Sequence, residues 1–192
     1  MREISRTMQG KKRMVPRENI VLTGFMGSGK SAVGRRVAGR LRFQFVDTDR
    51  LIVERAGMPV SEIFARHGEE HFRDLETEAL ESLDVRRGCV IATGGGVVVK
   101  ERNRAILARL GFTVWLTASE DVIFHRVSRN DKRPLLQTGD PRATIRALLA
   151  ARRPLYESAA QFTLDTSALS HDEAAGAVVA AARSAFGWDS EK

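Results

Sequence analysis

The chain has little of what marks secreted, membrane-spanning or single-strand-binding proteins. Its 192 residues include one cysteine, Cys89, which stands in an apolar run, so we expect a buried thiol in a fold that needs no disulfides. No run of about 18 apolar residues and no N-terminal signal region occur, which predicts a cytoplasmic protein without a membrane span. Aromatic residues make up 6% of the chain and are not interleaved with basic residues, which argues against binding of single-stranded nucleic acid.

Positive charge is in excess, but it is concentrated near the N-terminus. The formal net charge is +7, and residues 1–18 contribute six basic against two acidic side chains. We therefore expect a disordered basic tail over residues 1–18, a single domain over residues 19–188 and a short C-terminal tail over residues 189–192. We expect a monomer with no specific nucleic-acid partner; weak contact between the tail and nucleic acid is the alternative.

The stretch Gly24–Ser31 fits the phosphate-loop pattern G-x-x-x-x-G-K-[S/T] at every fixed position and follows the apolar run Ile20–Leu22. In such a loop the backbone N–H groups converge on a triphosphate, because glycines permit the required backbone path. Lys30 is predicted to reach the β- and γ-phosphates, and Ser31 to offer its hydroxyl to Mg²⁺. The expected backbone donors to the phosphates are those of Gly27, Ser28 and Gly29.

Short apolar segments alternate along the chain with stretches of helical periodicity. We expect strands near residues 20–22, 43–46, 89–93, 112–116 and 162–164, and helices near residues 30–41, 49–56, 61–83, 102–110, 119–129, 140–157 and 171–186. The third helix is expected to break near Gly68. This alternation predicts an α/β fold with three layers, α/β/α, around a five-stranded parallel sheet. The polar segment at about 130–140 is expected to form a lid.

Two aspartates follow the second predicted strand. Asp47 stands at its C-terminal end, the edge at which open α/β sheets bind ligands, so we expect it to hold Mg²⁺ together with Ser31. Asp49 projects to the same side if the extended backbone continues, which would direct it to an acceptor hydroxyl. The alternative is that Asp49 only caps the following helix.

Three further features have two interpretations each. Arg73 has Glu76 three residues later, which predicts either an oriented guanidinium for a carboxylate or phosphate, or a solvated surface pair. The run Gly94–Gly96 at a strand end favours close approach of a small ligand, but it is also typical of a turn. The basic segment Arg129–Pro134 is either a lid that brings an arginine to the transferred phosphate or a solvated loop.

Together these stretches resemble the shikimate kinases, a family of P-loop small-molecule kinases. The resemblance spans about residues 19–186 and rests on Gly24–Ser31, Asp47–Asp49, Ile63–Phe64 with Gly68 and Phe72–Arg73, Gly94–Gly96, Arg133–Leu136 and Arg152–Tyr156. It implies transfer of the γ-phosphoryl group of ATP to the 3-hydroxyl of shikimate, which gives shikimate 3-phosphate and ADP on the route to aromatic amino acids. It therefore implies the P-loop kinase fold, with ATP and Mg²⁺ as cofactors and shikimate as the small-molecule partner.

The resemblance also implies roles for individual residues. Lys30 and Arg133 would act on the transferred phosphate, and Arg126 would lie near the adenine. Asp49 would bind the acceptor hydroxyl and take its proton. The catalytic residues that the resemblance implies are therefore Lys30, Asp49 and Arg133.

On the shikimate side, the resemblance implies that Arg73 and Arg152 bind the carboxylate. Arg152 follows from the family's R-x-P-L-Y spacing, and its neighbour Arg153 is the alternative. The remaining contacts that it implies are the backbone of Gly94, Gly95 and Gly96 and the apolar walls Phe64 and Phe72.

The chain departs from the family at one nucleotide contact. Where the family often has a proline against the adenine, this chain has His171, which leaves the adenine contacts open. A kinase for gluconate or for a nucleoside monophosphate is the alternative enzyme. A nucleotide switch or a nucleic-acid-binding protein is the alternative from another class.

Overall fold

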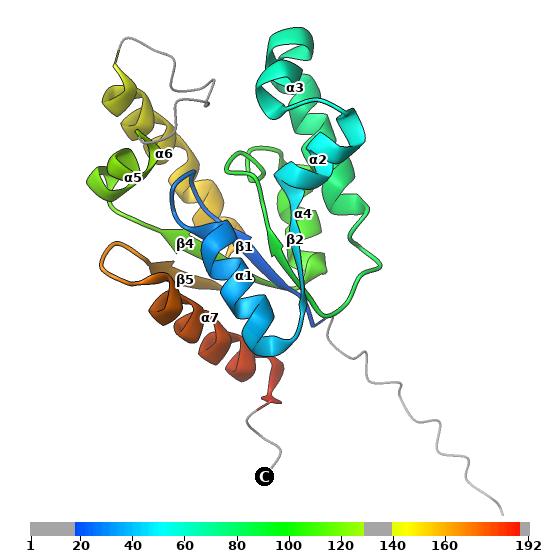
Figure 1. Cartoon of the computed structure of the whole chain (residues 1–192), viewed down its shortest axis with the longest axis vertical. Coiled ribbons are helices and arrows are strands. Elements are labelled where there is room, and N and C mark those ends of the chain that lie inside the picture. Colours follow the sequence, from blue (N-terminus) through cyan, green and yellow to red (C-terminus); the bar gives the residue numbers. More distant parts are fainter. Residues whose placement is uncertain (1–17, 129–139, 189–192) are drawn as a thin grey trace, which may run out of the picture.

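The computed structural model describes residues 18–128 and 140–188 (Figure 1). In chain order its elements are β1 (Ile20–Thr23), α1 (Lys30–Leu41), β2 (Gln44–Asp47), α2 (Thr48–Ala56), α3 (Val60–Glu81), β3 (Cys89–Ala92), α4 (Glu101–Leu110), β4 (Phe112–Thr117), α5 (Glu120–Val127), α6 (Pro141–Ala159), β5 (Phe162–Asp165) and α7 (His171–Phe186). Every predicted strand and helix is present. The expected terminal tails, apart from residue 18, and the lid segment, apart from residue 140, lie outside the described residues.

The strands form one parallel sheet in the order β2-β3-β1-β4-β5. β1 and β3 are buried over their whole length and β4 over all but its last residue, which explains why these strands are mostly apolar instead of alternating. The order reverses at β1, because the chain runs from β1 to the edge strand β2, returns to β3 beside β1, and then continues on the other side of β1 with β4 and β5. The carboxyl end of β1, where the phosphate loop begins, is therefore the switch point at which such sheets bind ligands.

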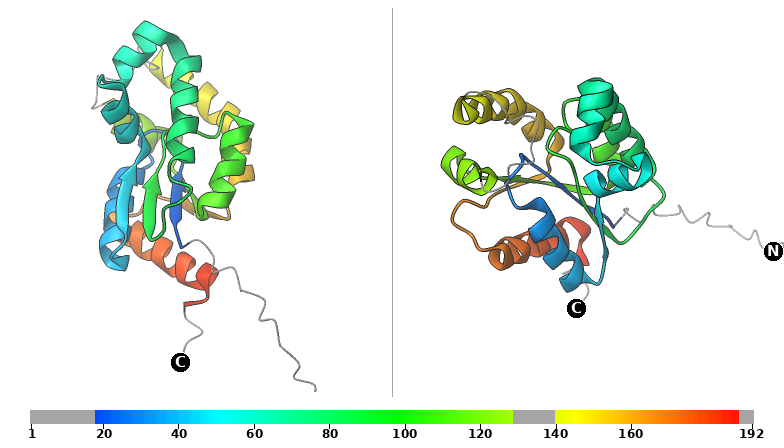
Figure 2. Two further views of the ribbon diagram at one scale, coloured as in Figure 1. Left: turned by 90° about the vertical axis from the view of Figure 1, so that its right-hand side faces the viewer. Right: turned by 45° about the horizontal axis from the view of Figure 1, so that its top comes forward.

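Helices cover both faces of this sheet, as predicted (Figure 2). Ile20 and Leu22 point to one face, where they pack with apolar residues of α1 and α7. Val21 points to the opposite face, into a cluster that includes residues of α3, α4 and α6. The alternation along a single strand thus builds the three layers, and the predicted α/β/α fold is confirmed.

Two smaller apolar clusters support the elements that flank the phosphate loop. Ile52 of α2 and Ile63, Phe72 and Ala79 of α3 pack together, which fixes the helix pair seen on one side of the loop in Figure 1. α3 is kinked as predicted, because Gly68 has φ 81° and ψ 175°. On the other side, Phe25 of the loop packs among residues of α5 and α6.

The expectation of a buried cysteine is confirmed. Cys89 is 1% exposed at the start of β3, and burial raises the pKa of its thiol. No helix in the described ranges has the length and apolar character needed to cross a bilayer.

Candidate active site

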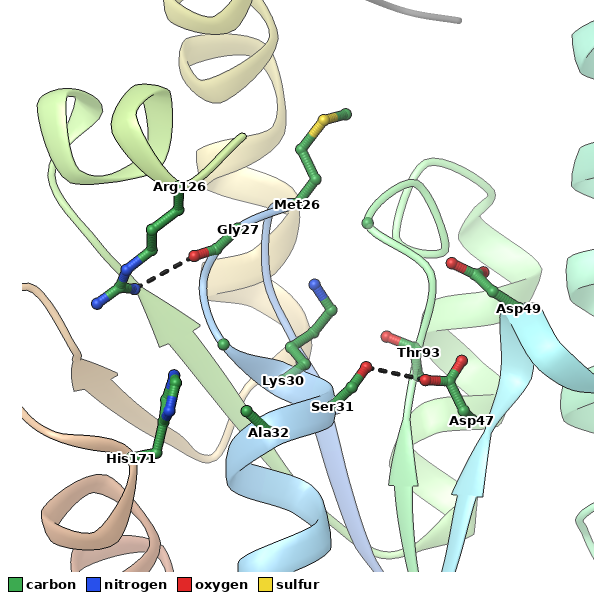
Figure 3. Close-up of a pocket in the computed structure, with 12 residues that line it drawn as sticks. Met26, Gly27, Lys30, Ser31, Ala32, Asp47, Asp49, Thr93, Arg126 and His171 are labelled. Carbon is green, nitrogen blue, oxygen red and sulfur yellow. Dashed lines mark hydrogen bonds between the residues drawn. The ribbon is translucent and has the colours of Figure 1, made fainter. Parts of the chain in front are cut away.

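The phosphate loop lies between β1 and α1. Gly24, Gly27 and Gly29 have φ of 140°, 80° and 93°, values that side chains with a Cβ rarely adopt. Gly29 is the N-cap of α1 and no side chain caps this helix, which leaves its first N–H groups and positive dipole end to a ligand. Next to the loop is a pocket of about 390 Å³ (Figure 3), lined by Met26, Gly27, Gly29, Lys30, Ser31, Ala32, Asp47, Asp49, Thr93, Gly95, Arg126 and His171.

Lys30 is held by the loop that precedes it. Its Nζ donates hydrogen bonds to the carbonyls of Gly24 at 2.7 Å and Phe25 at 2.8 Å, and the residue is 8% exposed. The side chain extends into the pocket (Figure 3). Gly27 and Gly29 also line the pocket, whereas Ser28 is fully buried and its N–H donates to the Phe25 carbonyl at 3.2 Å.

Ser31 and Asp47 meet across the pocket floor. The Ser31 hydroxyl donates to Asp47 Oδ2 at 2.8 Å, and the other carboxylate oxygen accepts from the backbone N–H of Arg50 at 3.4 Å. A hydroxyl and a carboxylate are the hard oxygen donors that Mg²⁺ prefers, and Mg²⁺ at nucleotides takes few protein ligands because phosphates and water supply the rest. The pair therefore fits Mg²⁺.

Asp49 lines the same pocket, but the backbone reaches it differently from the prediction. β2 ends at Asp47 and α2 begins at Thr48, so Asp49 stands in the first helical turn and not on a continued strand. The reason is that the Asp47 carboxylate caps α2 through the N–H of Arg50. The alternative in which Asp49 is the cap is therefore also wrong.

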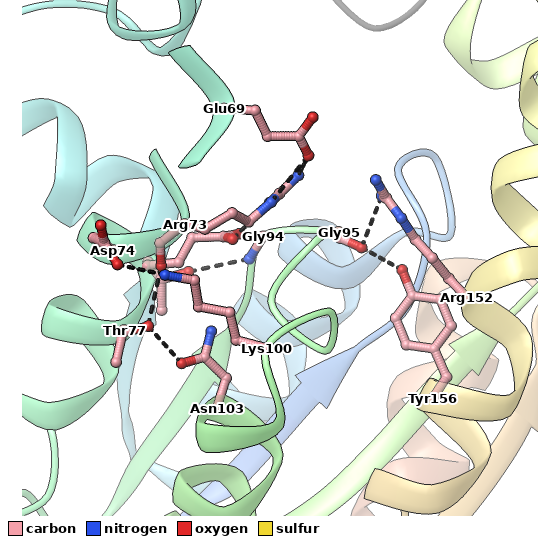
Figure 4. A network of polar contacts seen from close by, with 12 residues as sticks. Glu69, Arg73, Asp74, Thr77, Gly94, Gly95, Lys100, Asn103, Arg152 and Tyr156 are labelled. Carbon is pink, nitrogen blue, oxygen red and sulfur yellow. Dashed lines mark hydrogen bonds and ion pairs between the residues drawn. The ribbon is translucent and has the colours of Figure 1, made fainter. Parts of the chain in front are cut away.

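Arg73 is a buried residue of α3 between two carboxylates. It is 5% exposed; its Nη1 donates to Glu76 Oε2 at 2.6 Å and its Nη2 to Glu69 Oε1 at 2.7 Å (Figure 4). Glu76 is only 1% exposed, so the interpretation of Arg73 and Glu76 as a solvated surface pair is wrong. Burial raises the pKa of Glu76 to about 7, against the opposing effect of the Arg73 charge.

The glycine run after β3 packs directly against these side chains. The N–H of Gly94 donates to the Thr48 hydroxyl at 3.1 Å, and a Cβ on Gly96 would stand 1.9 Å from Nη1 of Arg73. The run is therefore a close approach of backbone to the buried arginine and not only a turn. Gly95 lines the pocket, so this backbone also forms part of the pocket wall.

If Arg73 binds the carboxylate of shikimate as predicted, changing Gly96 to alanine is expected to raise the KM for shikimate about tenfold or more, because the new methyl group would displace the guanidinium and weaken the predicted charged hydrogen bond. Gly39→Ala is the matched control, since a Cβ there meets nothing within 4 Å. Steady-state kinetics with thermal melts of both variants provide the measurement. An unchanged shikimate KM in a folded Gly96→Ala protein would contradict this arrangement.

Arg152 enters the same region from α6 and is 6% exposed. Its Nη1 donates to the Gly95 carbonyl at 3.3 Å, and that carbonyl also accepts a hydrogen bond from the Tyr156 hydroxyl (Figure 4). Arg153, in contrast, is exposed and pairs with Glu157 at 3.2 Å. The burial difference favours Arg152 over Arg153 as the predicted carboxylate ligand.

Phe64 and Phe72 lie together on α3. Their ring centroids are 4.7 Å apart, and the Arg73 guanidinium carbon is 5.6 Å from the Phe72 centroid. The two rings thus support the helix face that carries Arg73, and their role as walls for shikimate stays a prediction.

Arg126 and His171 occupy the opposite end of the pocket. Arg126 donates to the Gly27 carbonyl and to the Thr166 carbonyl, both at 3.2 Å, and so connects α5, the phosphate loop and the segment after β5. His171 is the first residue of α7, and its ring lies 3.6 Å from the point where a Cβ on Gly29 would stand. Both side chains flank the phosphate loop, on the side away from Asp49 (Figure 3).

Comparison with known proteins gives the family of this chain. A protein-family model described as shikimate kinase matches residues 26–183. The chain belongs to the shikimate kinase family. It is 46% identical to the shikimate kinase of Thermodesulfovibrio yellowstonii over 162 residues, which are 84% of this chain and 93% of the relative. It is 48% identical to that of Geobacter sulfurreducens over 155 residues, 81% of this chain and 85% of the relative.

A solved structure of the family agrees with the fold. It is the shikimate kinase from Acinetobacter baumannii in complex with shikimate, which matches with a TM-score of 0.85 at 36% identity and covers 90% of this chain and 95% of its own. The resemblance found from the motifs is therefore confirmed at the level of the family and the fold.

Sequence reasoning missed three partners within this shikimate kinase site. Glu69 binds Arg73 from one helical turn away, and a search of α3 for acids at i−4 as well as i+3 would have found it. Tyr156 belongs to the segment Arg152–Tyr156 but had no predicted role. Thr166 accepts from Arg126 through its backbone carbonyl at 3.2 Å and its hydroxyl at 3.5 Å, and no local sequence pattern indicates this contact. The predicted lid arginine, Arg133, lies outside the described residues.

Proposed function

We propose that this member of the shikimate kinase family transfers the γ-phosphoryl group of ATP to the 3-hydroxyl of shikimate, which yields shikimate 3-phosphate and ADP for aromatic amino-acid biosynthesis. One observation carries the proposal. Asp49 and Gly95 line the same pocket as Lys30 and Ser31. The buried Arg73 and Arg152 lie against the glycine run Gly94–Gly96, beside which the acceptor would bind. The proposed site for the triphosphate therefore lies next to the proposed site for an acceptor that carries hydroxyl groups and a carboxylate.

On the nucleotide side, the loop amides and the N-terminus of α1 bind the phosphates. Lys30 exchanges its contacts with the Gly24 and Phe25 carbonyls for the β- and γ-phosphates and so balances negative charge there. Ser31 and Asp47 would hold Mg²⁺, which would neutralise part of the negative charge of the phosphates. Arg126 and His171 border the part of the nucleotide beyond the phosphates.

On the acceptor side, Arg73 and Arg152 bind the shikimate carboxylate and thereby orient the ring. Asp49 accepts a hydrogen bond from the 3-hydroxyl and takes its proton as the oxygen attacks the γ-phosphorus. A new oxygen–phosphorus bond forms, the bond between the γ-phosphorus and the β–γ bridging oxygen breaks, and ADP leaves. Positioning and charge supply the catalysis, which suits phosphoryl transfer.

An acceptor panel tests this function. Purified protein with ATP and Mg²⁺ is expected to release ADP upon addition of shikimate, and to release almost none with gluconate, nucleoside monophosphates or no acceptor. A coupled ADP assay measures the rates. Turnover with another acceptor and none with shikimate would favour the alternative kinases. The monomeric state and the cytoplasmic location stay predictions.

A further inference from the structure

Glu76 is a buried acid with one unused oxygen. Its Oε2 accepts from Arg73 at 2.6 Å, whereas its Oε1 is buried and has no hydrogen-bond partner among the described residues. The whole residue is 1% exposed, so water does not replace the missing partner from bulk solvent. Such an oxygen is a place where a proton can be added at little structural cost.

The charges around Glu76 come from three helices. Arg73 and Glu69 stand on α3 with it, Asp49 faces it from α2, and Arg152 faces it from α6, where Tyr156 also lies. Glu76 Oε1 and Asp49 Oδ1 lie 2.5 and 2.6 Å from the point at which a Cβ of Gly94 would stand, so the two carboxylates meet beside this glycine. The negative charge of Glu76 is thus repelled by Asp49 and attracted by Arg73 and Arg152. The proposed function assigns these same two arginines to the carboxylate of the acceptor.

We propose that Glu76 is the resident counter-ion of Arg73 and takes up a proton at Oε1 when the carboxylate of the acceptor binds. The inference rests on the proposed function, because it requires that Arg73 and Arg152 bind the acceptor carboxylate. The proton comes from a buffer acid or from hydronium, whose bond to the proton breaks as an O–H bond forms on Glu76, and the conjugate base stays in solution. The acceptor then replaces Glu76 as the negative partner of the arginine pair.

The electrostatics of the free protein give the direction in which the affinity for shikimate changes with pH. Burial and, less strongly, the charge of Asp49 raise the pKa of Glu76, whereas Arg73 and Arg152 lower it; the net result is a pKa of about 7. A carboxylate on these arginines cancels the two charges that favour ionised Glu76, and a bound ring excludes water from beside it, so both effects raise the pKa again. Protonation upon binding means that the affinity for shikimate falls as pH rises above about 7, by up to about tenfold per pH unit.

Isothermal titration of shikimate into the whole protein at pH 7.5, in phosphate and in Tris buffer, measures the proton uptake. The difference between the two binding enthalpies, divided by the difference in buffer ionisation enthalpy, gives the protons taken up per shikimate. We expect roughly half a proton for the wild type and none for Glu76→Gln, which keeps an oxygen for Arg73 but does not ionise. Glu69→Gln is the control, because it removes the charge of the solvated partner of the same arginine and is expected to retain the uptake.

Two results would overturn the inference: equal uptake in Glu76→Gln and wild type, or no uptake by a wild type that binds shikimate. The wild-type dissociation constant between pH 6.5 and 8.5 provides a second measurement that does not depend on the folding of any variant. A constant value over this range would also overturn the inference. Absence of any saturable heat with shikimate would instead contradict the proposed function itself.

Discussion

Replacing Asp49 by asparagine is expected to lower kcat by about 10²- to 10⁴-fold while the KM for ATP changes little. Asparagine has nearly the same shape but does not accept the proton of the attacking hydroxyl. Asp49 stands on α2, across the pocket from the phosphate loop, so its loss leaves the nucleotide contacts in place. Steady-state kinetics with ATP and shikimate varied separately are the measurement.

Asp47→Asn is the matched comparison for Asp49→Asn. It alters the carboxylate that accepts from Ser31, so it is expected to raise the Mg²⁺ concentration needed for half-maximal rate, an effect that Asp49→Asn does not share. Turnover by Asp49→Asn at the wild-type rate would remove the proposed proton transfer from the mechanism.

Replacing Arg152 by alanine is expected to raise the KM for shikimate by about 10- to 100-fold, because a charged hydrogen bond of about 1.5–3 kcal/mol to the carboxylate is lost. The KM for ATP is expected to change much less, because Arg152 lies beside Gly95 and Phe25 and not among the residues that line the pocket at its nucleotide end. The separation of the two KM values distinguishes lost acceptor binding from a general loss of stability.

Arg153→Ala is the control for this prediction, since the two arginines are adjacent but only Arg152 is buried. Arg153 pairs with Glu157 at the surface, and such pairs contribute little. Its shikimate KM is expected to stay within about twofold of the wild type. Should Arg153→Ala raise the KM and Arg152→Ala leave it unchanged, the assignment of the two arginines would have to be exchanged.

Much of the fold was predictable because its signals are local. The strands β1 and β3 in the middle of the sheet are short and mainly apolar, since both faces are covered by helices, and the phosphate loop has fixed glycine, lysine and serine positions. The N-caps of two helices are local in the same sense. The side chains of Ser119, before α5, and Asp140, before α6, each accept a hydrogen bond from the backbone N–H three residues later. Such features depend on neighbours in sequence, and sequence alone shows them.

The details of the acceptor site were less predictable because they depend on tertiary contacts. The backbone conformation at Asp49 depends on which aspartate caps α2. Asp47 and Asp49 are only two residues apart, and the sequence allows either of them to be the cap. Whether Arg73 is a surface residue or a buried one depends on the approach of Gly96, which is 23 residues away along the chain. The raised pKa of Glu76 follows first from its burial and then from charges on three helices, which no local pattern contains.

The position of the phosphate on the product tests the central claim most directly. Shikimate, ATP and Mg²⁺ are incubated with the protein, and the product is examined by phosphorus–proton correlation NMR. Transfer to the hydroxyl held by Asp49 predicts one new phosphate ester whose phosphorus couples to the proton on carbon 3, together with an equal amount of ADP. Coupling to the proton on carbon 4 or 5, or free phosphate without an ester, would contradict the proposed arrangement of Asp49, Arg73 and Arg152 around shikimate.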